Sequence, residues 1–191
     1  MITLLDAMER KESAKRIRKL GYVPCSIYGS GVDRNMDIQI EDKEINRFLK
    51  SHSIGAKAKV KINASELPCV IKSIQYEPIS SKPMHIEFYA SSEDKLVKVK
   101  VPFKFKGKEQ LFSNKLVLNI LEDEIEIQGV LKDLPEFVEI NVSLMKDGSV
   151  ITMEDIALPE GIRLLSRKDE VVVRASEASQ PTLPVQNEFV V

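Results

Sequence analysis

Apolar and polar residues alternate along several short stretches of this chain, a pattern typical of β-strands with one buried face. Glycine, proline, asparagine and serine separate the stretches, as expected of turns. Within the first 90 residues the pattern predicts strands in five places: 25–28, 37–40, 60–62, 69–74 and 85–88. Five or more short strands predict a small β-barrel.

Two short helices interrupt these strands. Ser13 can cap a helix that ends near Leu20, and Gly21 is suited to the left-handed conformation that ends a helix. Ile17 and Leu20 are three residues apart, so both are expected to point inward. A second helix is expected over residues 41–50, where apolar residues recur at helical spacing.

The polar segment 91–94 marks the expected boundary between two domains. Beyond it the β pattern continues in four places: 96–101, 125–127, 137–142 and 171–173. We therefore expect a mainly β chain with short helices (an α+β fold). A β-barrel domain with two helices is expected over residues 1–91, a mostly antiparallel β domain over 92–175 and a tail without regular structure over 176–191.

The composition is that of a folded protein, with 191 residues of which 43% are hydrophobic and 30% charged. No apolar run approaches the roughly 18 residues of a membrane span, and no secretory signal is recognisable. We expect a cytosolic protein without a membrane partner or a small-molecule substrate. Cys25 and Cys69 are far apart and outside any Cys-x-x-Cys pair, so they are expected to be small buried residues. No metal or other cofactor is expected.

The net charge of −1 conceals an asymmetry between the two halves of the chain. Residues 1–90 contain 15 Lys and Arg against 11 Asp and Glu, whereas the remainder contains 13 against 18. Six cations lie between Arg10 and Lys19, with Glu12 as the one acidic residue among them. Such a cluster can neutralise phosphates, and the alternative is a solvated helix face.

Residues that carry chemistry are sparse. His85 and Glu87 lie two apart on a predicted strand and so project from one face. The pair resembles half of a zinc deaminase signature, but the Pro-Cys-x-x-Cys half is missing. A histidine beside a carboxylate can also read base edges or 2'-hydroxyls of RNA. A core histidine with a satisfied hydrogen bond is the alternative that the pattern leaves open.

Several motifs, taken in order, resemble those of the bacterial ribosomal proteins that bind 5S rRNA. In the first half they are Arg10, Arg18-Lys19-x-Gly21-x-x-Pro24, Ile27-Tyr28-Gly29, Ile71-Lys72-Ser73-Ile74-Gln75 and His85-Ile86-Glu87-Phe88. In the second half they are 97–103, 134–143 and 158–162, which are similar to the C-terminal domain of the two-domain general-stress (Ctc-type) form. Motifs in the right order are more specific than any one alone.

The resemblance implies a structural protein of the large (50S) ribosomal subunit rather than an enzyme, with 5S rRNA as partner of the N-terminal domain and with no cofactor. It also implies a monomer away from the ribosome. Eight residues are the implied RNA contacts: Arg10, Lys15, Arg18, Lys19, Tyr28, Gln75, His85 and Glu87. Glu87 departs from the family's usual Asp by one methylene, and residues 108–116 replace a glycine-rich turn.

Two other functions remain compatible with the residues themselves. One is a cytosolic stress-related interaction protein whose acidic C-terminal domain is the working surface. The other is an unrecognised hydrolase. Direct measurement of 5S rRNA binding separates the ribosomal function from the stress-related one.

Overall fold

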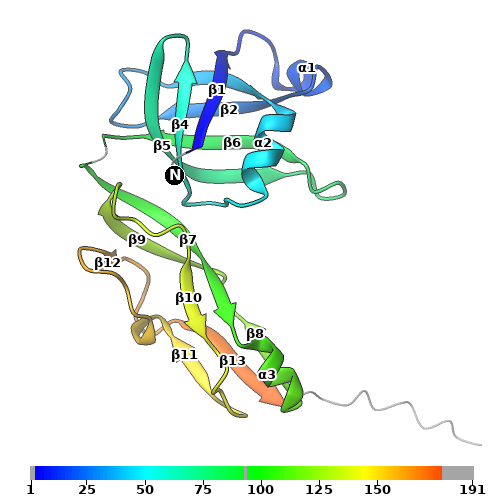
Figure 1. Ribbon diagram of the computed structural model, residues 1–191, viewed down its shortest axis with the longest axis vertical. Coiled ribbons are helices and arrows are strands. Elements are labelled where there is room, and N and C mark those ends of the chain that lie inside the picture. The colour runs from blue at the N-terminus through cyan, green and yellow to red at the C-terminus, as the bar shows by residue number, and fades with distance from the viewer. Residues whose placement is uncertain (1–2, 93, 178–191) are drawn as a thin grey trace, which may run out of the picture.

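The computed structural model describes residues 3–92 and 94–177. Six strands close into a barrel in the N-terminal half (Figure 1), in the order β1-β3-β2-β6-β5-β4. Their bounds are β1 (Thr3–Glu9), β2 (Tyr22–Tyr28), β3 (Met36–Glu41), β4 (Lys57–Ile62), β5 (Ser65–Tyr76) and β6 (Pro83–Ala90). Adjacent strands are antiparallel except for the parallel pairs β1/β4 and β2/β6. The predicted barrel is confirmed.

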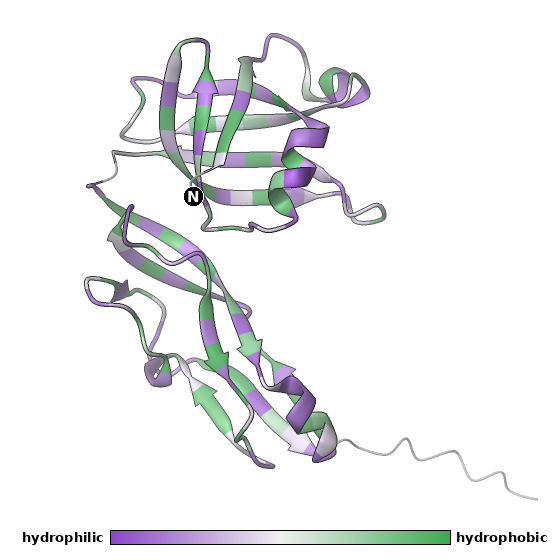
Figure 2. Ribbon diagram, viewed as in Figure 1, coloured by the Kyte–Doolittle hydropathy of each residue, from purple (hydrophilic) through white to green (hydrophobic). Residues whose placement is uncertain are grey.

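Hydrophobic and hydrophilic residues alternate along the barrel strands (Figure 2). One set of side chains therefore points into the barrel core and the other set points outside. On β6, for example, Ile86 and Phe88 are fully buried, whereas the alternate residues His85 and Glu87 are partly exposed. Cys25 and Cys69 are buried and unpaired, as expected. His85 and Glu87 therefore lie outside the barrel core.

Helices α1 (Ala14–Lys19) and α2 (Asp42–Leu49) lie where two helices are predicted. Ser13 occupies the N-cap position of α1, but its side chain makes no capping hydrogen bond within the described residues. Gly21 follows the helix with φ +84°, as expected of a left-handed residue. Ile17 is buried, whereas Leu20 is 64% exposed. The expectation that Leu20 points inward is wrong, because the helix ends before that residue completes the buried face.

The C-terminal half contains a four-stranded and a three-stranded sheet. The first has the order β10-β7-β9-β12, from β10 (Val138–Asn141), β7 (Leu96–Lys106), β9 (Glu124–Val130) and β12 (Arg163–Leu164). The second has the order β11-β13-β8, from β11 (Val150–Thr152), β13 (Val171–Glu177) and β8 (Leu116–Ile120). Pairing is antiparallel except between β10 and β7, so the mostly antiparallel fold is confirmed.

Two details of this half differ from the sequence pattern. Residues expected to form an altered turn contain the helix α3 (Lys108–Ser113), and a short 3-10 helix, η1 (Met153–Asp155), precedes the loop to β12. The last strand reaches Glu177, which pairs with Leu116, so Ser176 and Glu177 belong to a sheet rather than to the expected tail. The rest of that tail, 178–191, lies outside the described residues.

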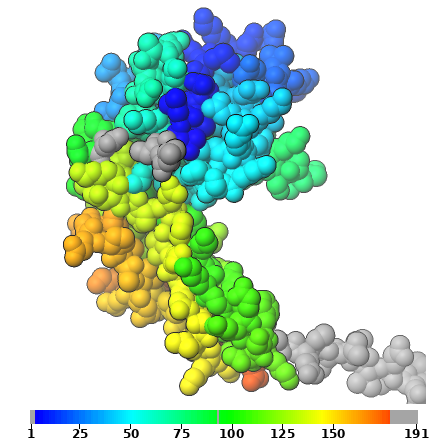
Figure 3. Space-filling model, viewed as in Figure 1, coloured from blue at the N-terminus to red at the C-terminus, as the bar shows by residue number. Residues whose placement is uncertain are grey.

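The two halves share a packed junction (Figures 1 and 3). Val70 on β5 is fully buried in the C-terminal core. Tyr89 on β6 pairs with Val70 in the β5/β6 register and packs against the same core. The Lys72 ammonium also donates a hydrogen bond to the Lys98 carbonyl at 2.7 Å. In the part of the chain that the structure describes, no helix has both the length and the apolar character to cross a membrane.

Candidate nucleic-acid interface

The parallel pairing of β2 with β6 builds a polar face on the outside of the barrel. Ser26 lies beside Glu87 in this register, and Tyr28 lies beside Tyr89. All four side chains are partly exposed, because each is flanked along its strand by residues that point into the core. Strands far apart in the sequence thus bring a hydroxyl, a phenol and a carboxylate together.

His85 belongs to this outward face. The Nε2 atom of His85 lies 3.1 Å from the Ser26 Oγ, and the imidazole is partly buried rather than part of the barrel core. A hydroxyl can donate to or accept from an imidazole nitrogen, so this contact fixes the ring plane whichever tautomer is present. Within residues 3–92 and 94–177, the other ring nitrogen of His85 makes no hydrogen bond.

Tyr28 and Glu87 form a second polar pair on the same face. The Tyr28 hydroxyl donates a hydrogen bond of 3.2 Å to the Glu87 Oε2. Burial is the main cause that raises the pKa of the Tyr28 hydroxyl above its ordinary value, and the adjacent Glu87 carboxylate raises it further. The phenol therefore remains protonated at neutral pH, and it orients one carboxylate oxygen while leaving the other to accept from a partner.

Two further predicted contacts flank this face. Gln75 on β5 is exposed and lies opposite His85 in the register of β5 with β6. Arg10 is more enclosed, with 17% of its side chain exposed, and its Nη2 lies 2.8 Å from the Asp37 Oδ2. The backbone of Asp37 is the neighbour of Ser26 on β2, so this ion pair lies at the border of the polar face.

The three predicted cations of α1 lie together at the other end of the face. Lys15, Arg18 and Lys19 line a hollow of about 340 Å³. Its lining also includes Tyr22, Lys82 from the turn between β5 and β6, and two acidic residues, Asp42 and Glu77. The Arg18 Nη1 donates to the carbonyl of the residue that precedes His85, at 3.3 Å. This bond joins α1 to β6 and sets the cationic helix beside the polar face.

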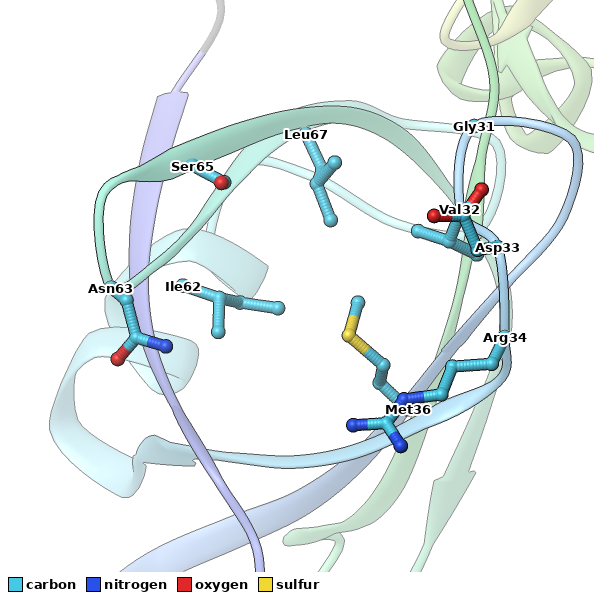
Figure 4. Close-up of a pocket in the computed structure, with 9 residues that line it drawn as sticks. All are labelled: Gly31, Val32, Asp33, Arg34, Met36, Ile62, Asn63, Ser65 and Leu67. Carbon is cyan, nitrogen blue, oxygen red and sulfur yellow. The ribbon is translucent and has the colours of Figure 1, made fainter.

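A different hollow opens at one end of the barrel and has a volume of about 450 Å³ (Figure 4). Met36, Ile62 and Leu67 supply its apolar lining, and Arg34 and Asn63 contribute polar groups. Its lining contains none of the eight predicted RNA contacts. The polar face and this hollow are therefore separate features.

The described residues contain no group of three His, Cys, Asp or Glu side chains placed to hold a metal ion. Burial raises the pKa of both the Cys25 and Cys69 thiols to about 12, so neither is a thiolate at neutral pH. The polar face itself offers hydroxyl, imidazole and carboxylate groups that can donate or accept hydrogen bonds.

Sequence reasoning missed three residues of this region: Ser26, Tyr22 and Lys82. Ser26 could have been found, because it lies two residues before Tyr28 on the same strand and so shares its face. No local signal marks the other two, which line the hollow beside α1 from separate segments.

Comparison with known proteins agrees with this arrangement in both halves of the chain. Residues 5–88 match the Ribosomal L25p family, and residues 96–179 match the family described as ribosomal protein TL5, C-terminal domain. The large ribosomal subunit protein bL25 of Desulfitobacterium hafniense is 32% identical over 176 residues, which cover 92% of this chain and 98% of that protein. The bL25 protein of Caldicellulosiruptor saccharolyticus is 33% identical over 162 residues, covering 85% and 79%.

The similarity extends over nearly the full length of a third relative. The bL25 protein of Clostridium tetani is 26% identical over 189 residues, which cover 98% of this chain and 97% of that protein. The first matched region covers most of the barrel, and the second covers the C-terminal sheets. This chain therefore belongs to the bL25 family of bacterial large-subunit ribosomal proteins, in its two-domain Ctc/TL5 form.

Proposed function

We propose that this protein binds 5S rRNA through its N-terminal barrel domain (residues 1–91) and holds that RNA within the large ribosomal subunit in the cytosol. The observation that carries the proposal is the outward row of Ser26, Tyr28, His85 and Glu87 on two parallel strands. The row offers donors and acceptors at fixed positions, as recognition of sugars and base edges in a shallow RNA minor groove requires.

The cations of α1 give this row its affinity for nucleic acid. Lys15, Arg18 and Lys19 are exposed at one end of the row and can neutralise phosphates beside the groove. Phosphate contacts position a protein on RNA, whereas base and sugar contacts provide discrimination. We assign discrimination to Tyr28, Gln75, His85 and Glu87.

Arg10 has a narrower role in this proposal. Its guanidinium is paired with Asp37 and also donates to the Glu12 carbonyl at 3.1 Å. It can offer RNA only the part of the guanidinium that these contacts leave uncovered. We propose that Arg10 chiefly holds the segment between β1 and α1 against β3, with a contact at the edge of the RNA footprint.

Binding of the full-length chain to in vitro transcribed bacterial 5S rRNA tests the proposal. A filter-binding titration with tRNA as competitor should show retention of 5S rRNA at competitor concentrations that abolish nonspecific binding. Equal competition by tRNA and by unlabelled 5S rRNA would contradict the assignment. We further propose that the free protein is monomeric and that its role is structural, without turnover; analytical ultracentrifugation checks the first point.

A further inference from the structure

Tyr89 connects the polar face of the barrel to the C-terminal domain. The rings of Tyr28 and Tyr89 meet edge to face, with centroids 5.7 Å apart and an interplanar angle of 82°. Tyr89 also packs against the C-terminal core. One aromatic ring therefore touches a predicted RNA contact and also packs against a core cluster in which Val70 joins residues of the C-terminal domain.

The backbone around Tyr89 is built for this close approach. A Cβ atom on Gly29, directly after Tyr28, would lie 2.9 Å from the Tyr89 ring and 2.4 Å from the Ala90 carbonyl oxygen. Gly29 also has a φ of +127°, a conformation that side chains rarely adopt. The strand that carries Tyr28 can thus press against β6 at Tyr89 only because residue 29 is glycine.

The two domains also meet at other residues close to Tyr89. Val70, opposite Tyr89 in the β5/β6 register, is fully buried in the C-terminal core rather than the barrel core. The Lys72 ammonium donates a hydrogen bond to the Lys98 carbonyl on the adjoining strand β7. A Cβ atom on Gly55 would lie 2.9 Å from the Lys100 carbonyl, so the barrel backbone closely approaches β7 there as well.

From these contacts we propose that Tyr89 is a positioning residue, through which the packed C-terminal domain sets the ring of Tyr28 for RNA binding. The inference rests on the proposed 5S rRNA function. The Tyr28 hydroxyl donates to Glu87, and the Tyr89 ring supports the Tyr28 ring from the side in this position. Loss of the Tyr89 ring frees the Tyr28 side chain to leave that position, and loosening of the domain junction has the same effect from farther away.

Titration of full-length variants with 5S rRNA tests the first step. Tyr89→Ala should weaken binding by about two- to tenfold, the worth of an aromatic pair, without changing the salt slope. Tyr89→Phe keeps the ring and should bind as the wild type does. In a Tyr28→Ala background, Tyr89→Ala should cause no further loss, because the two residues act as one unit. Equal losses in both backgrounds would overturn the proposal.

NMR of the protein without RNA tests the second step and does not depend on the proposed function. With 13C at the tyrosine ring Cε positions, the signal of Tyr28 is identified as the one lost in Tyr28→Phe. Val70→Asn, which places a polar amide in the C-terminal core, should shift the Tyr28 signal and weaken RNA binding. An unchanged Tyr28 signal in a folded Val70→Asn protein would show that the C-terminal domain does not act on Tyr28. Failure of the wild type to bind 5S rRNA would overturn the proposed function alone.

Discussion

His85→Ala distinguishes an RNA contact from a merely structural histidine. In the free protein, the imidazole makes one side-chain hydrogen bond at 3.1 Å to Ser26, at a partly buried site. A neutral bond of this kind contributes about 1 kcal/mol to stability. In a chain of 191 residues this loss lowers the melting temperature by roughly 2–4 °C. The variant should therefore remain folded at 25 °C.

The effect on RNA binding should be larger than the effect on folding. If His85 reads the groove, the RNA groups that it satisfies stay desolvated in the interface and lose their partner, at a cost of about 1–3 kcal/mol. This corresponds to a dissociation constant that is roughly five- to 150-fold larger. Filter binding at 25 °C, well below the melting temperature, measures the loss without a contribution from unfolded protein.

Two matched variants separate the causes. Ser26→Ala removes the same intramolecular hydrogen bond from the other side and should reproduce the stability loss of His85→Ala, but only part of its affinity loss. His52→Ala removes the other histidine of the chain, whose ring stacks on the ring of Phe48 in α2. This variant should leave RNA affinity unchanged. A folded His85→Ala protein that binds 5S rRNA as tightly as the wild type would remove this residue from the interface.

Lys15→Ala and Lys19→Ala should each reduce the magnitude of the slope of log affinity against log salt by about 0.7–0.9, measured by titration at several salt concentrations. Alanine substitution of a cation on α2 is the control. Equal slopes for the wild type and the α1 variants would exclude α1 as the phosphate-facing element. Glu87→Asp should keep 5S rRNA affinity within about tenfold of wild type, a change of about 1.4 kcal/mol, whereas Glu87→Ala should be clearly weaker. Because burial raises the pKa of Cys25 and Cys69 to about 12, both thiols should resist a disulfide reagent at pH 8 and react in denaturant; rapid labelling of the native protein would contradict their burial.

The alternation of apolar and polar residues was sufficient to predict the barrel, but not its first strand. On β1, Leu5 and Ala7 point inward, while Leu4 and Met8 are 43% and 49% exposed. Apolar residues on both faces hide the period of two on which a strand prediction rests. In α3 the reason is similar, because Leu111 is buried beside an exposed Phe112 and six residues are too few to show a helical period.

The sequence predicts which residues belong to the candidate site, but it does not predict which side chains contact each other there. Spacing along β6 correctly places His85 and Glu87 on one face. Their partners, Ser26 and Tyr28, lie 59 residues away along the chain and become neighbours only through the parallel pairing of β2 with β6. A period within one strand cannot reveal which other strand lies beside it.

The order of strands around the barrel has a consequence for synthesis of the protein. β1 is joined to β3 and β4, but β2 pairs with β6, whose last residue is Ala90. The barrel therefore cannot close until nearly half of the chain has left the ribosome that makes it, and such non-local pairing folds slowly. Until then β2 has an open edge that could pair with another nascent chain. The polar face comes into existence only when β6 pairs with β2, so an unfinished barrel cannot present it.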